Sequence, residues 1–432
     1  MKKIEKIIGI MDPNGYSFRA AFEGLINFLK PQIEYNGEIH EIITQRISTR
    51  PYNVLKAICP YSAIINRGAH WNPHHNSFFM TVGYKSYLLN DMISFTSINK
   101  NTSYGHMFKL GFNVPSTIAL PQQDYSELVE NPKVNTELIF SEHEFFDLKS
   151  LGEEVGYPAY LKPQSGGGWI GVTKVNNDQE LIDTYNKSGN KPMNLQKAIE
   201  YREFVRTVGI GPQMLPMHYN ASAQYSHDRY LRSENQAVDF DFLTKEENEE
   251  IRLITKVINA FYKWDHNSCE TLIGHDGKCY PIDFANAYPD SSVVSLHYYF
   301  PDLVKSMVKW MIFCTVTNRK KSFNFAYDWP QYFEINEDKD LSYKEKLQLY
   351  STVADEYFET KKFEDFCDKY LVDFDKKSKK FFASKDFEDI IRQEVDYYFN
   401  LPHERPLKVQ HYLGINKFWL HCQDAKLNNA AK

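Results

Sequence analysis

The sequence predicts a mixed α/β and α+β protein built in three successive parts. Residues 1–95 alternate strand-like and helix-like segments, and residues 96–300 are richer in strands, with a glycine-rich loop and a hairpin pattern. After residue 300 the composition shifts to helix-forming, aromatic and charged residues. These observations predict an α/β domain over 1–95, an α+β domain over 96–300 with lobes at about 96–194 and 195–300, and a helical region over 301–432.

The first part has the pattern of a parallel sheet. Residues 7–11 form a short apolar run, as expected of a buried strand, and residues 12–15 (Asp-Pro-Asn-Gly) predict a turn. Residues 18–29 place apolar side chains at helical spacing, and residues 39–43 and 62–65 again favour strands. Strand–helix–strand alternation predicts parallel strands whose ligand-binding loops follow their carboxyl ends.

The segment 66–76 follows the third predicted strand and therefore falls where ligands usually bind. It contains His70, His74 and His75. A metal or substrate site is one interpretation, but the histidine spacing matches no standard zinc pattern. Ordinary structural histidines are the other interpretation.

The remaining parts show helical and strand patterns of their own. Residues 101–110 predict a helix that ends at Gly111, a suitable C-terminal capping residue, and residues 118–120 predict a strand. Beyond residue 300, Leu347, Tyr350, Val353 and Tyr357 recur at helical spacing. We expect these helices to be packing elements, with a partner surface as the alternative.

Composition excludes several classes of protein. The chain has 432 residues, 42% of them hydrophobic and 15% aromatic, which is too apolar for a disordered chain. The net charge of −6 argues against duplex nucleic acid or an anionic membrane as a partner. The six cysteines form no C-x-x-C pair, and no run of 18 apolar residues occurs. We expect a cytoplasmic protein.

The most informative segment lies at 159–172, where a strand delivers Lys162 into a glycine-rich loop before a second strand begins at Val172. Glycines allow backbone N–H groups to approach a polyphosphate closely, and a lysine adds a point charge. The lysine precedes the glycines, so this is not the P-loop motif. A flexible hairpin loop is the alternative, and Trp169 within it either packs over a phosphate or covers the site.

A second informative pattern is a hairpin that carries Glu270 on one strand and Asp283 on the other, with Asn286 just beyond. Two carboxylates and an amide oxygen are ligands suited to Mg²⁺. A solvated acidic face is the alternative. Cys279, next to Tyr280, is most simply a core residue.

Taken in order, these blocks resemble the ATP-grasp superfamily, with spacing similar to that of D-alanine–D-alanine ligase, over roughly residues 96–300. The resemblance implies an ATP-grasp fold with a Rossmann-like pre-ATP-grasp domain and a helical C-terminal extension. It implies ATP and Mg²⁺ as cofactors, with Mn²⁺ as a substitute. The implied nucleotide-binding residues are Lys100, Lys162, Ser165, Gly166, Gly167 and Gly168 for the phosphates, Gln196, Lys197 and Ile199 for the base, and Glu203 for the ribose. The implied metal ligands are Glu270, Asp283 and Asn286.

The sequence departs from the family pattern at three places. Asp283-x-x-Asn286 is one residue longer than the usual E-x-N, and Gln196 stands where relatives often carry Glu. Ser268 stands where many ligases place an arginine, two residues before the first metal carboxylate. The candidates to supply this charge are Arg206, His227, Arg229 and Arg232. A structural salt bridge is the alternative for each.

The resemblance implies an ATP-dependent carboxylate–amine ligase that forms an acylphosphate and releases ADP and phosphate. Its partners would be small-molecule or peptide carboxylate and amine substrates, bound between the glycine loop and residues 66–76, with no nucleic acid and no membrane. We leave open a homodimer. The alternatives are a kinase-like enzyme that phosphorylates a small molecule and an inactive nucleotide-binding regulator.

Overall fold

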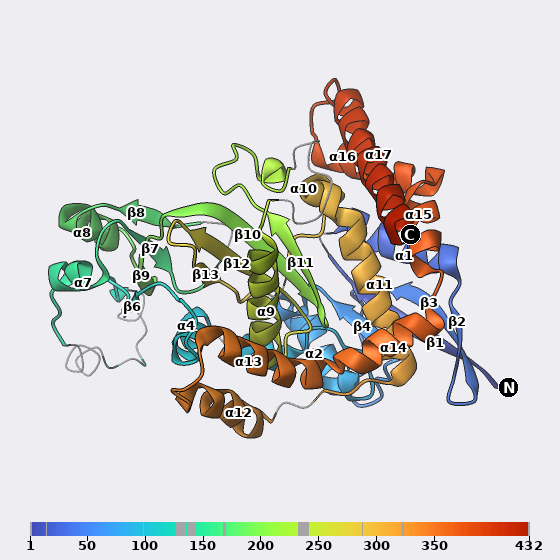
Figure 1. Ribbon diagram of the computed structural model, residues 1–432, viewed down its shortest axis with the longest axis horizontal. Helices are drawn as coiled ribbons and strands as arrows, with labels where there is room; N and C mark the ends of the chain where they lie inside the picture. The colour runs from blue at the N-terminus through green and yellow to red at the C-terminus, as the bar shows by residue number, and fades with distance from the viewer. Residues whose placement is uncertain are drawn as a thin grey trace. The chain divides into compact units, whose positions relative to one another are not determined.

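The chain forms two compact units in a computed structural model that describes residues 2–13, 15–97, 99–126, Lys133, Asn135, 144–166, 170–231, 242–286, 288–321 and 324–430 (Figure 1). Unit 1 contains Met1–Ser97, Glu203–Thr271 and Phe284–Lys432, and unit 2 contains Ile98–Arg202 and Leu272–Asp283. The predicted combination of an α/β sheet, antiparallel sheets and C-terminal helices is confirmed.

The N-terminal part of unit 1 is a five-stranded sheet of order β2–β3–β1–β4–β5, parallel except for β2. Its strands are β1 (Lys2–Met11), β2 (Gln32–Tyr35), β3 (Glu38–Arg46), β4 (Ala63–Asn66) and β5 (Tyr87–Leu88). Helix α1 (Tyr16–Leu29) follows β1 and buries Phe18, Phe22 and Leu25. The carboxyl ends of β1 and β4 are neighbours because the chain crosses to the other side of β1 after β3.

The segment 66–76 is more ordered than the predicted loop. It contains the short helix η1 (Ala69–Trp71) and the start of α2 (Pro73–Val82). Asn72 caps α2 through its side chain, and Pro73 occupies the first turn, where its missing N–H costs nothing. Two further helices, η2 (Gly83–Lys85) and α3 (Met92–Ser97), complete this part.

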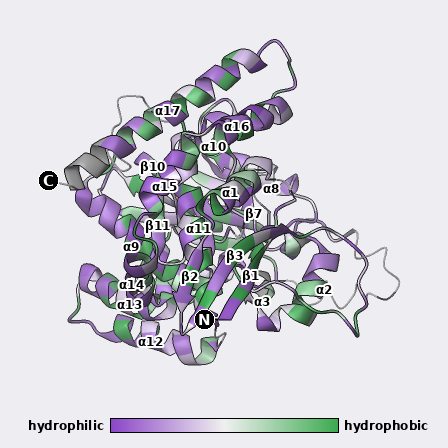
Figure 2. Ribbon diagram, turned by 90° about the vertical axis from the view of Figure 1, so that its right-hand side faces the viewer, coloured by the Kyte–Doolittle hydropathy of each residue, from purple (hydrophilic) through white to green (hydrophobic). Residues whose placement is uncertain are grey.

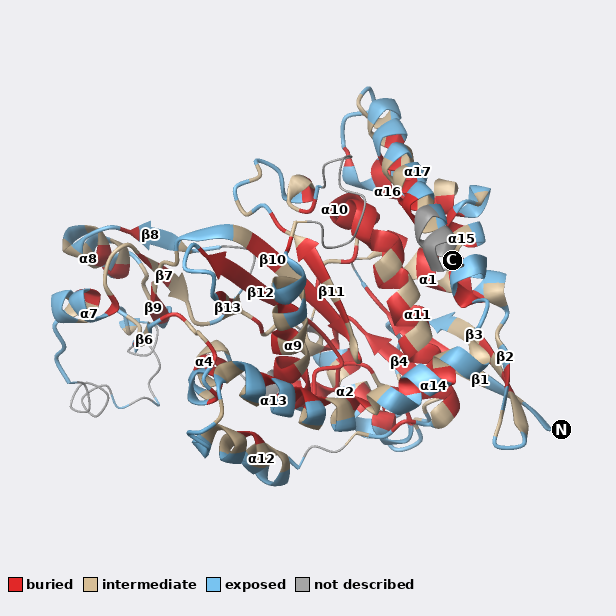
Figure 3. Ribbon diagram, viewed as in Figure 1, coloured by how far each residue is buried: buried red, intermediate tan, exposed pale blue. Residues whose placement is uncertain are grey.

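The second sheet has the order β11–β10–β12–β13. Its strands are β10 (Tyr201–Ile210), β11 (Gln213–His218), β12 (His266–Gly274) and β13 (Cys279–Asp283). Helix α9 (Lys245–Phe261) starts at a capping box formed by Thr244 and Glu247 and packs against β11. Strand β12 is buried along its whole length (Figure 3). The short helix η3 (Ser226–Asp228) follows β11.

The C-terminal part of unit 1 is helical. Its elements are α10 (Val293–Leu296), η4 (His297–Tyr299), α11 (Phe300–Thr317), α12 (Phe325–Glu337), α13 (Tyr343–Phe358), α14 (Thr360–Tyr370), α15 (Phe374–Phe382), α16 (Lys385–Tyr398) and α17 (Arg405–Ala430). Helix α11 is almost entirely buried and packs on β1, β2 and β4, with Lys305 and Lys309 both paired to Asp375. No helix of the described residues is long and apolar enough to cross a membrane.

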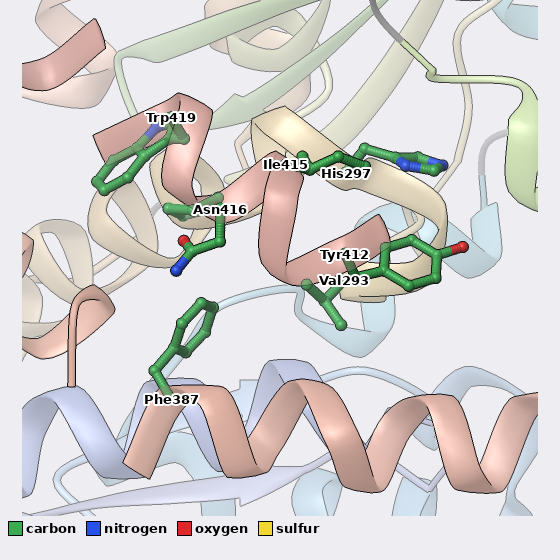
Figure 4. Close-up of a pocket in the computed structure, with 8 residues that line it drawn as sticks. Val293, His297, Phe387, Tyr412, Ile415, Asn416 and Trp419 are labelled. Carbon is green, nitrogen blue, oxygen red and sulfur yellow. The ribbon is translucent and has the colours of Figure 1, made fainter. Parts of the chain in front are cut away.

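Hydrophobic and hydrophilic residues alternate along α17, the longest helix (Figure 2). Its apolar side chains pack toward α10, η4 and α16, where a small cleft remains (Figure 4). Asn416 in this cleft donates to the Phe382 carbonyl oxygen at 2.8 Å, and Trp419 donates to Asp302 at 3.0 Å. These contacts tie α17 to α15 and α11.

Unit 2 contains an antiparallel sheet of order β6–β9–β7–β8. The elements are α4 (Lys100–Lys109), β6 (Thr117–Leu120), α7 (Leu148–Val155), β7 (Ala159–Pro163), β8 (Thr173–Val175), α8 (Asp178–Asn186) and β9 (Met193–Lys197). One face of the sheet forms a core around Leu120, Leu161 and Leu195. Because side chains alternate along a strand, Lys162 and Gln196 lie on the opposite face.

A buried carboxylate joins distant parts of unit 1. Asp265, just before β12, is fully buried and accepts hydrogen bonds from Tyr87 (2.6 Å) and Tyr357 (2.8 Å). Arg319 and Lys321 form ion pairs with it at 3.1 and 2.9 Å. Burial alone would raise the pKa of Asp265, but the charges of Lys321 and Arg319 lower it below its usual value.

We expect Asp265→Asn to destabilise the protein by about 3–5 kcal/mol, because it removes the carboxylate that pairs with the buried Lys321 and leaves Arg319 with the partly exposed Glu359 at 3.4 Å. Since the native pKa is lowered, the stabilisation is present above the ordinary value of 3.8 and is lost as the pH falls further. Urea unfolding of both proteins at several pH values measures this. Tyr357→Phe, which removes one hydrogen bond, is the control and should cost about 1 kcal/mol. Equal losses in the two variants would contradict the ionic role.

Candidate functional site

Unit 2 holds a lysine whose hydrogen-bond partners are neutral. Lys162, in β7, donates to the Gln196 Oε1 atom at 2.7 Å and to the Tyr104 hydroxyl at 2.9 Å. Gln196 is fixed in turn, because its Nε2 atom donates to Thr117 at 2.8 Å. The strands β7 and β9 are paired in register, with Tyr160 opposite Gln196 and Lys162 opposite Asn194. This pairing holds the lysine and the amide on one face of the sheet.

The environment of Lys162 lowers the pKa of its side chain. Burial lowers the pKa of Lys162 to about 8, an effect that Asp283 opposes and Lys100 reinforces. The lysine therefore remains mainly protonated at neutral pH but lacks a hydrogen-bonded carboxylate. An anion that binds here would therefore interact with the positive charge of Lys162 and accept hydrogen bonds from its ammonium group.

The second predicted lysine lies in the same cluster. Lys100, the first residue of α4, forms an ion pair with Asp283 at the end of β13, at 2.9 Å. Tyr104, one helical turn along α4, donates to the carbonyl oxygen of Ile282. The structure thus brings together Lys100, Lys162, Gln196 and Asp283, four residues predicted from the sequence.

The other predicted nucleotide-binding residues of unit 2 lie at or just beyond the ends of the strands β7 and β9. Lys197 donates to the Tyr157 carbonyl oxygen at 2.9 Å, and Ile199 is partly buried between β9 and β10. Ser165 and Gly166 are exposed, and the φ of Gly166 is 108°, a conformation that favours glycine. Gly167, Gly168 and Trp169 lie outside the described residues.

Unit 1 holds the predicted metal ligand Glu270 beside an arginine. Arg206 of β10 forms an ion pair with Glu270 of the neighbouring strand β12 and donates to the Tyr230 hydroxyl at 3.1 Å. Its guanidinium lies over the Tyr219 ring, 4.5 Å from the centroid. The side chains of Arg206 and Glu270 are only 15% and 10% exposed, so the pair is largely desolvated.

Asn286 lies next to Ser268, two residues before Glu270. Its Nδ2 atom donates to the Ser268 hydroxyl at 2.9 Å, and its backbone N–H donates to Asn267 at 2.8 Å. Asn286 therefore faces the same part of β12 as Glu270 does. Glu270 and Asn286 belong to unit 1 and Asp283 to unit 2, so a metal site that all three share stays a prediction.

The remaining predicted residues of unit 1 have separate environments. Glu203 pairs with His218 at 3.3 Å. Arg229 donates to the Tyr219 hydroxyl at 3.3 Å. His227 packs among aromatic rings, including those of Tyr225 and Tyr398. Arg232 lies outside the described residues.

The three histidines of segment 66–76 face different partners. His70 contacts the Asp91 carbonyl oxygen at 3.1 Å, His74 contacts that of Arg50 at 2.9 Å, and His75 contacts the Thr49 hydroxyl at 3.3 Å. In the described part of the chain, no three His, Cys, Asp or Glu side chains form a group that could hold a metal. These contacts favour the structural interpretation of the histidines.

Sequence reasoning missed three tyrosines. Tyr104 lies four residues after Lys100 in a predicted helix, and that spacing places both on one face, so the sequence held a usable signal. Tyr219 and Tyr230 contact Arg206, the first through its ring and the second through its hydroxyl. They come from segments that share no sequence motif with Arg206. Nothing in the sequence pattern indicates them.

The chain matches no family model and no curated protein. It is similar in structure to ATP-grasp ligases. An ATP-grasp RimK domain protein from Sphaerobacter thermophilus is 13% identical, with a TM-score of 0.44 over 71% of this chain and 99% of the other. D-alanine–D-alanine ligase from Bacillus anthracis, complexed with ATP, is 16% identical, with a TM-score of 0.43 over 74% and 98%. The macrocyclase MdnC from Microcystis aeruginosa, bound with precursor peptide MdnA, is 13% identical, with a TM-score of 0.46 over 72% and 99%.

We expect polyphosphate binding to weaken as the pH rises through 8. The free Lys162 has a pKa of about 8, and a bound polyanion favours its protonated form, so affinity is full below pH 8 and falls above it. Calorimetry with inorganic tripolyphosphate between pH 6.5 and 9.5 measures this. Lys162→Met should lower the affinity at pH 7 by about tenfold to hundredfold and flatten the profile. The exposed Lys174→Met is the control, and an unchanged profile in the Lys162 variant would remove Lys162 from the site.

Proposed function

We propose that the protein is an ATP-dependent carboxylate–amine ligase that works through an acylphosphate. The observation that carries the proposal is Lys162, a buried lysine at the head of a glycine-rich loop whose hydrogen-bond partners are neutral. Lys100 adds a second cation in the same cluster. Two lysines with one neighbouring carboxylate, Asp283, form a suitable binding site for nucleotide phosphates.

The donor chemistry of the acidic residues fits Mg²⁺. Glu270 and Asp283 supply carboxylate oxygens and Asn286 an amide oxygen, all of them hard ligands. Each carboxylate is held by a cation, Glu270 by Arg206 and Asp283 by Lys100. When bound, the metal would neutralise charge on the phosphates and the transferred phosphoryl group.

The other residues have matching roles. Gln196 has its Oε1 atom and a second Nε2 hydrogen on the same face of the sheet as Lys162. There it would bind the adenine base of ATP together with Lys197 and Ile199. Glu203 would accept hydrogen bonds from the ribose hydroxyls. Arg206, beside Glu270, would stabilise charge on the transferred phosphoryl group. A substrate carboxylate would attack the γ-phosphate, ADP would leave, and an amine would then displace phosphate from the acylphosphate.

The test of this function is the requirement for two organic substrates. ADP formation is measured with MgATP and with pools of carboxylic acids, pools of amines, or both. We expect ADP release and an amide product only with both. Phosphorylated product from one pool alone would assign a kinase-like reaction, and the absence of turnover together with ATP binding would assign a nucleotide-binding regulator.

We expect Glu203→Ala to weaken binding of a non-hydrolysable ATP analogue by about tenfold, because a charge-assisted hydrogen bond to the ribose is lost. The 2′-deoxy form of the analogue should bind the wild type more weakly but the variant equally well. Calorimetry on two proteins and two nucleotides isolates the coupling. Glu200→Ala, three residues earlier and exposed, is the matched control. Additive losses would show that Glu203 does not contact the sugar.

We expect Glu270→Gln and Asp283→Asn each to reduce turnover at least about a hundredfold while analogue affinity falls much less. The metal acts mainly on charge that develops in the transition state, so losing a ligand affects the rate most. ADP formation as a function of Mg²⁺ and Mn²⁺ is the measurement. Asp276→Asn, in the exposed turn of the same hairpin, is the control. Near-normal turnover in both variants would refute the ligase proposal.

A further inference from the structure

Arg229 is a partly buried arginine that has no carboxylate partner among the residues that the structure describes. It follows η3, and its Nη1 atom donates a hydrogen bond to the Tyr219 hydroxyl at 3.3 Å. Its Nε atom is enclosed and has no hydrogen-bond partner. Among the ion pairs of the described residues, none involves Arg229. The guanidinium is therefore not balanced by a carboxylate of the described residues, and its Nε donor is unused.

A guanidinium in this position is costly without an anion. It always carries its charge and presents five donors in a planar fork that matches a carboxylate or a phosphate. Burying a charge is unfavourable unless it is paired, and a neutral phenol does not supply the missing charge. An anionic ligand would supply the missing charge.

The neighbouring charges do not meet this need. Asp228 contacts His227 at 3.6 Å, and Asp290 accepts the Ser292 backbone N–H at 3.2 Å. Asp290 acts on Tyr230 through space and forms no ion pair with Arg229 in the described part of the chain. The cluster around Tyr219 thus holds two guanidinium groups, those of Arg206 and Arg229, against the single carboxylate of Glu270.

The two arginines contact different parts of one side chain. Arg206 lies over the Tyr219 ring at 4.5 Å from its centroid, and Arg229 bonds to the hydroxyl at the far end. Tyr219 is itself held by Phe204 and Tyr230, whose ring centroids are 4.9 and 5.0 Å away. A rigid tyrosine therefore separates the arginine at Glu270 from Arg229. An anion on Arg229 is one side chain away from the proposed reaction centre.

We propose that Arg229, together with the Tyr219 hydroxyl, binds an oxyanion of a substrate other than the group that reacts. This rests on the proposed ligase function, which places the reacting carboxylate and the phosphoryl group at Arg206 and Glu270. The substrate pair then carries a second oxyanion, either a carboxylate or a phosphate. Arg229 determines specificity by selecting the substrate that bears it.

The first experiment needs no nucleotide and uses the wild-type chain. Phenylglyoxal modifies accessible arginines, and peptide mass spectrometry measures the rate at each site. We expect N-acetylglycine, inorganic phosphate or both to slow modification of Arg229 at least about threefold, as a saturating ligand would. Arg202, which is exposed on β10, reports non-specific effects. Protection by one anion alone identifies that source, whereas no protection by either, or equal protection at Arg202, overturns the proposal.

The second experiment uses the substrate pair once the pool assay has found it. Arg229→Gln should raise the KM for the substrate that carries the second oxyanion by about tenfold to hundredfold, with kcat changed less. A substrate analogue in which that group is a neutral amide or ester should have the same KM with the wild type and with the variant. Arg229→Lys keeps the charge but not the planar guanidinium, so its KM should lie between those of the wild type and Arg229→Gln. Arg202→Gln is the matched control. An unchanged KM overturns the proposal.

The experiments distinguish a failure of the ligase proposal from a failure of the oxyanion-site proposal. Absent ATP binding or absent ligation by the wild type would refute the ligase function, and the anion-protection experiment would still report on Arg229. Normal ligation with no role for Arg229 would refute the oxyanion site alone. In that case the charge of Arg229 would be structural, and Arg229→Gln would change only the urea midpoint.

Discussion

The buried carboxylate of Asp265 is the constraint on which the arrangement of unit 1 depends. Its four partners come from β5 (Tyr87), the end of α13 (Tyr357) and the segment after α11 (Arg319 and Lys321). Strand β12 begins at the next residue, and it carries Ser268 and Glu270. Because a charge in such a place is stable only with all its partners, the network fixes the start of β12 against the parallel sheet and the C-terminal helices. The C-terminal helices thereby help to hold the strand that bears the proposed metal ligand.

The sequence predicted best what local pattern determines. Apolar runs and helical spacing located β1, α1 and β4, and the hairpin of β12 and β13 was expected from its turn. Lys162, Gln196, Lys100 and Asp283 were expected in one site, and the structure brings these four together. What the sequence did not predict depends on contacts between distant segments. The Asp265 network joins positions 87, 265, 319, 321 and 357 with no shared motif, and the predicted loop at 66–76 contains helical turns because Asn72 caps α2.

The pairing of cations with the proposed metal ligands has a consequence for binding. Lys100 holds Asp283 and Arg206 holds Glu270, so a bare metal ion would compete with a cation already in place at each carboxylate. A nucleotide that brings its own metal avoids this competition. Under the proposed function, its phosphates would be partners for Lys100 and Arg206, and the two carboxylates would be among the residues that hold the metal. The two ion pairs therefore agree with the proposal that the ligand is a metal–nucleotide complex.

Lys162 and Arg229 illustrate one principle at two places in the chain. Lys162 has the Gln196 amide and the Tyr104 phenol as hydrogen-bond partners, and burial lowers its pKa to about 8. Arg229 likewise has a phenol, Tyr219, as its partner. Folding alone would favour a carboxylate beside each cation, because pairing offsets the cost of desolvation. A ligand that supplies an anion would offset this cost at each cation, and this is the shared basis of the proposals for Lys162 and for Arg229.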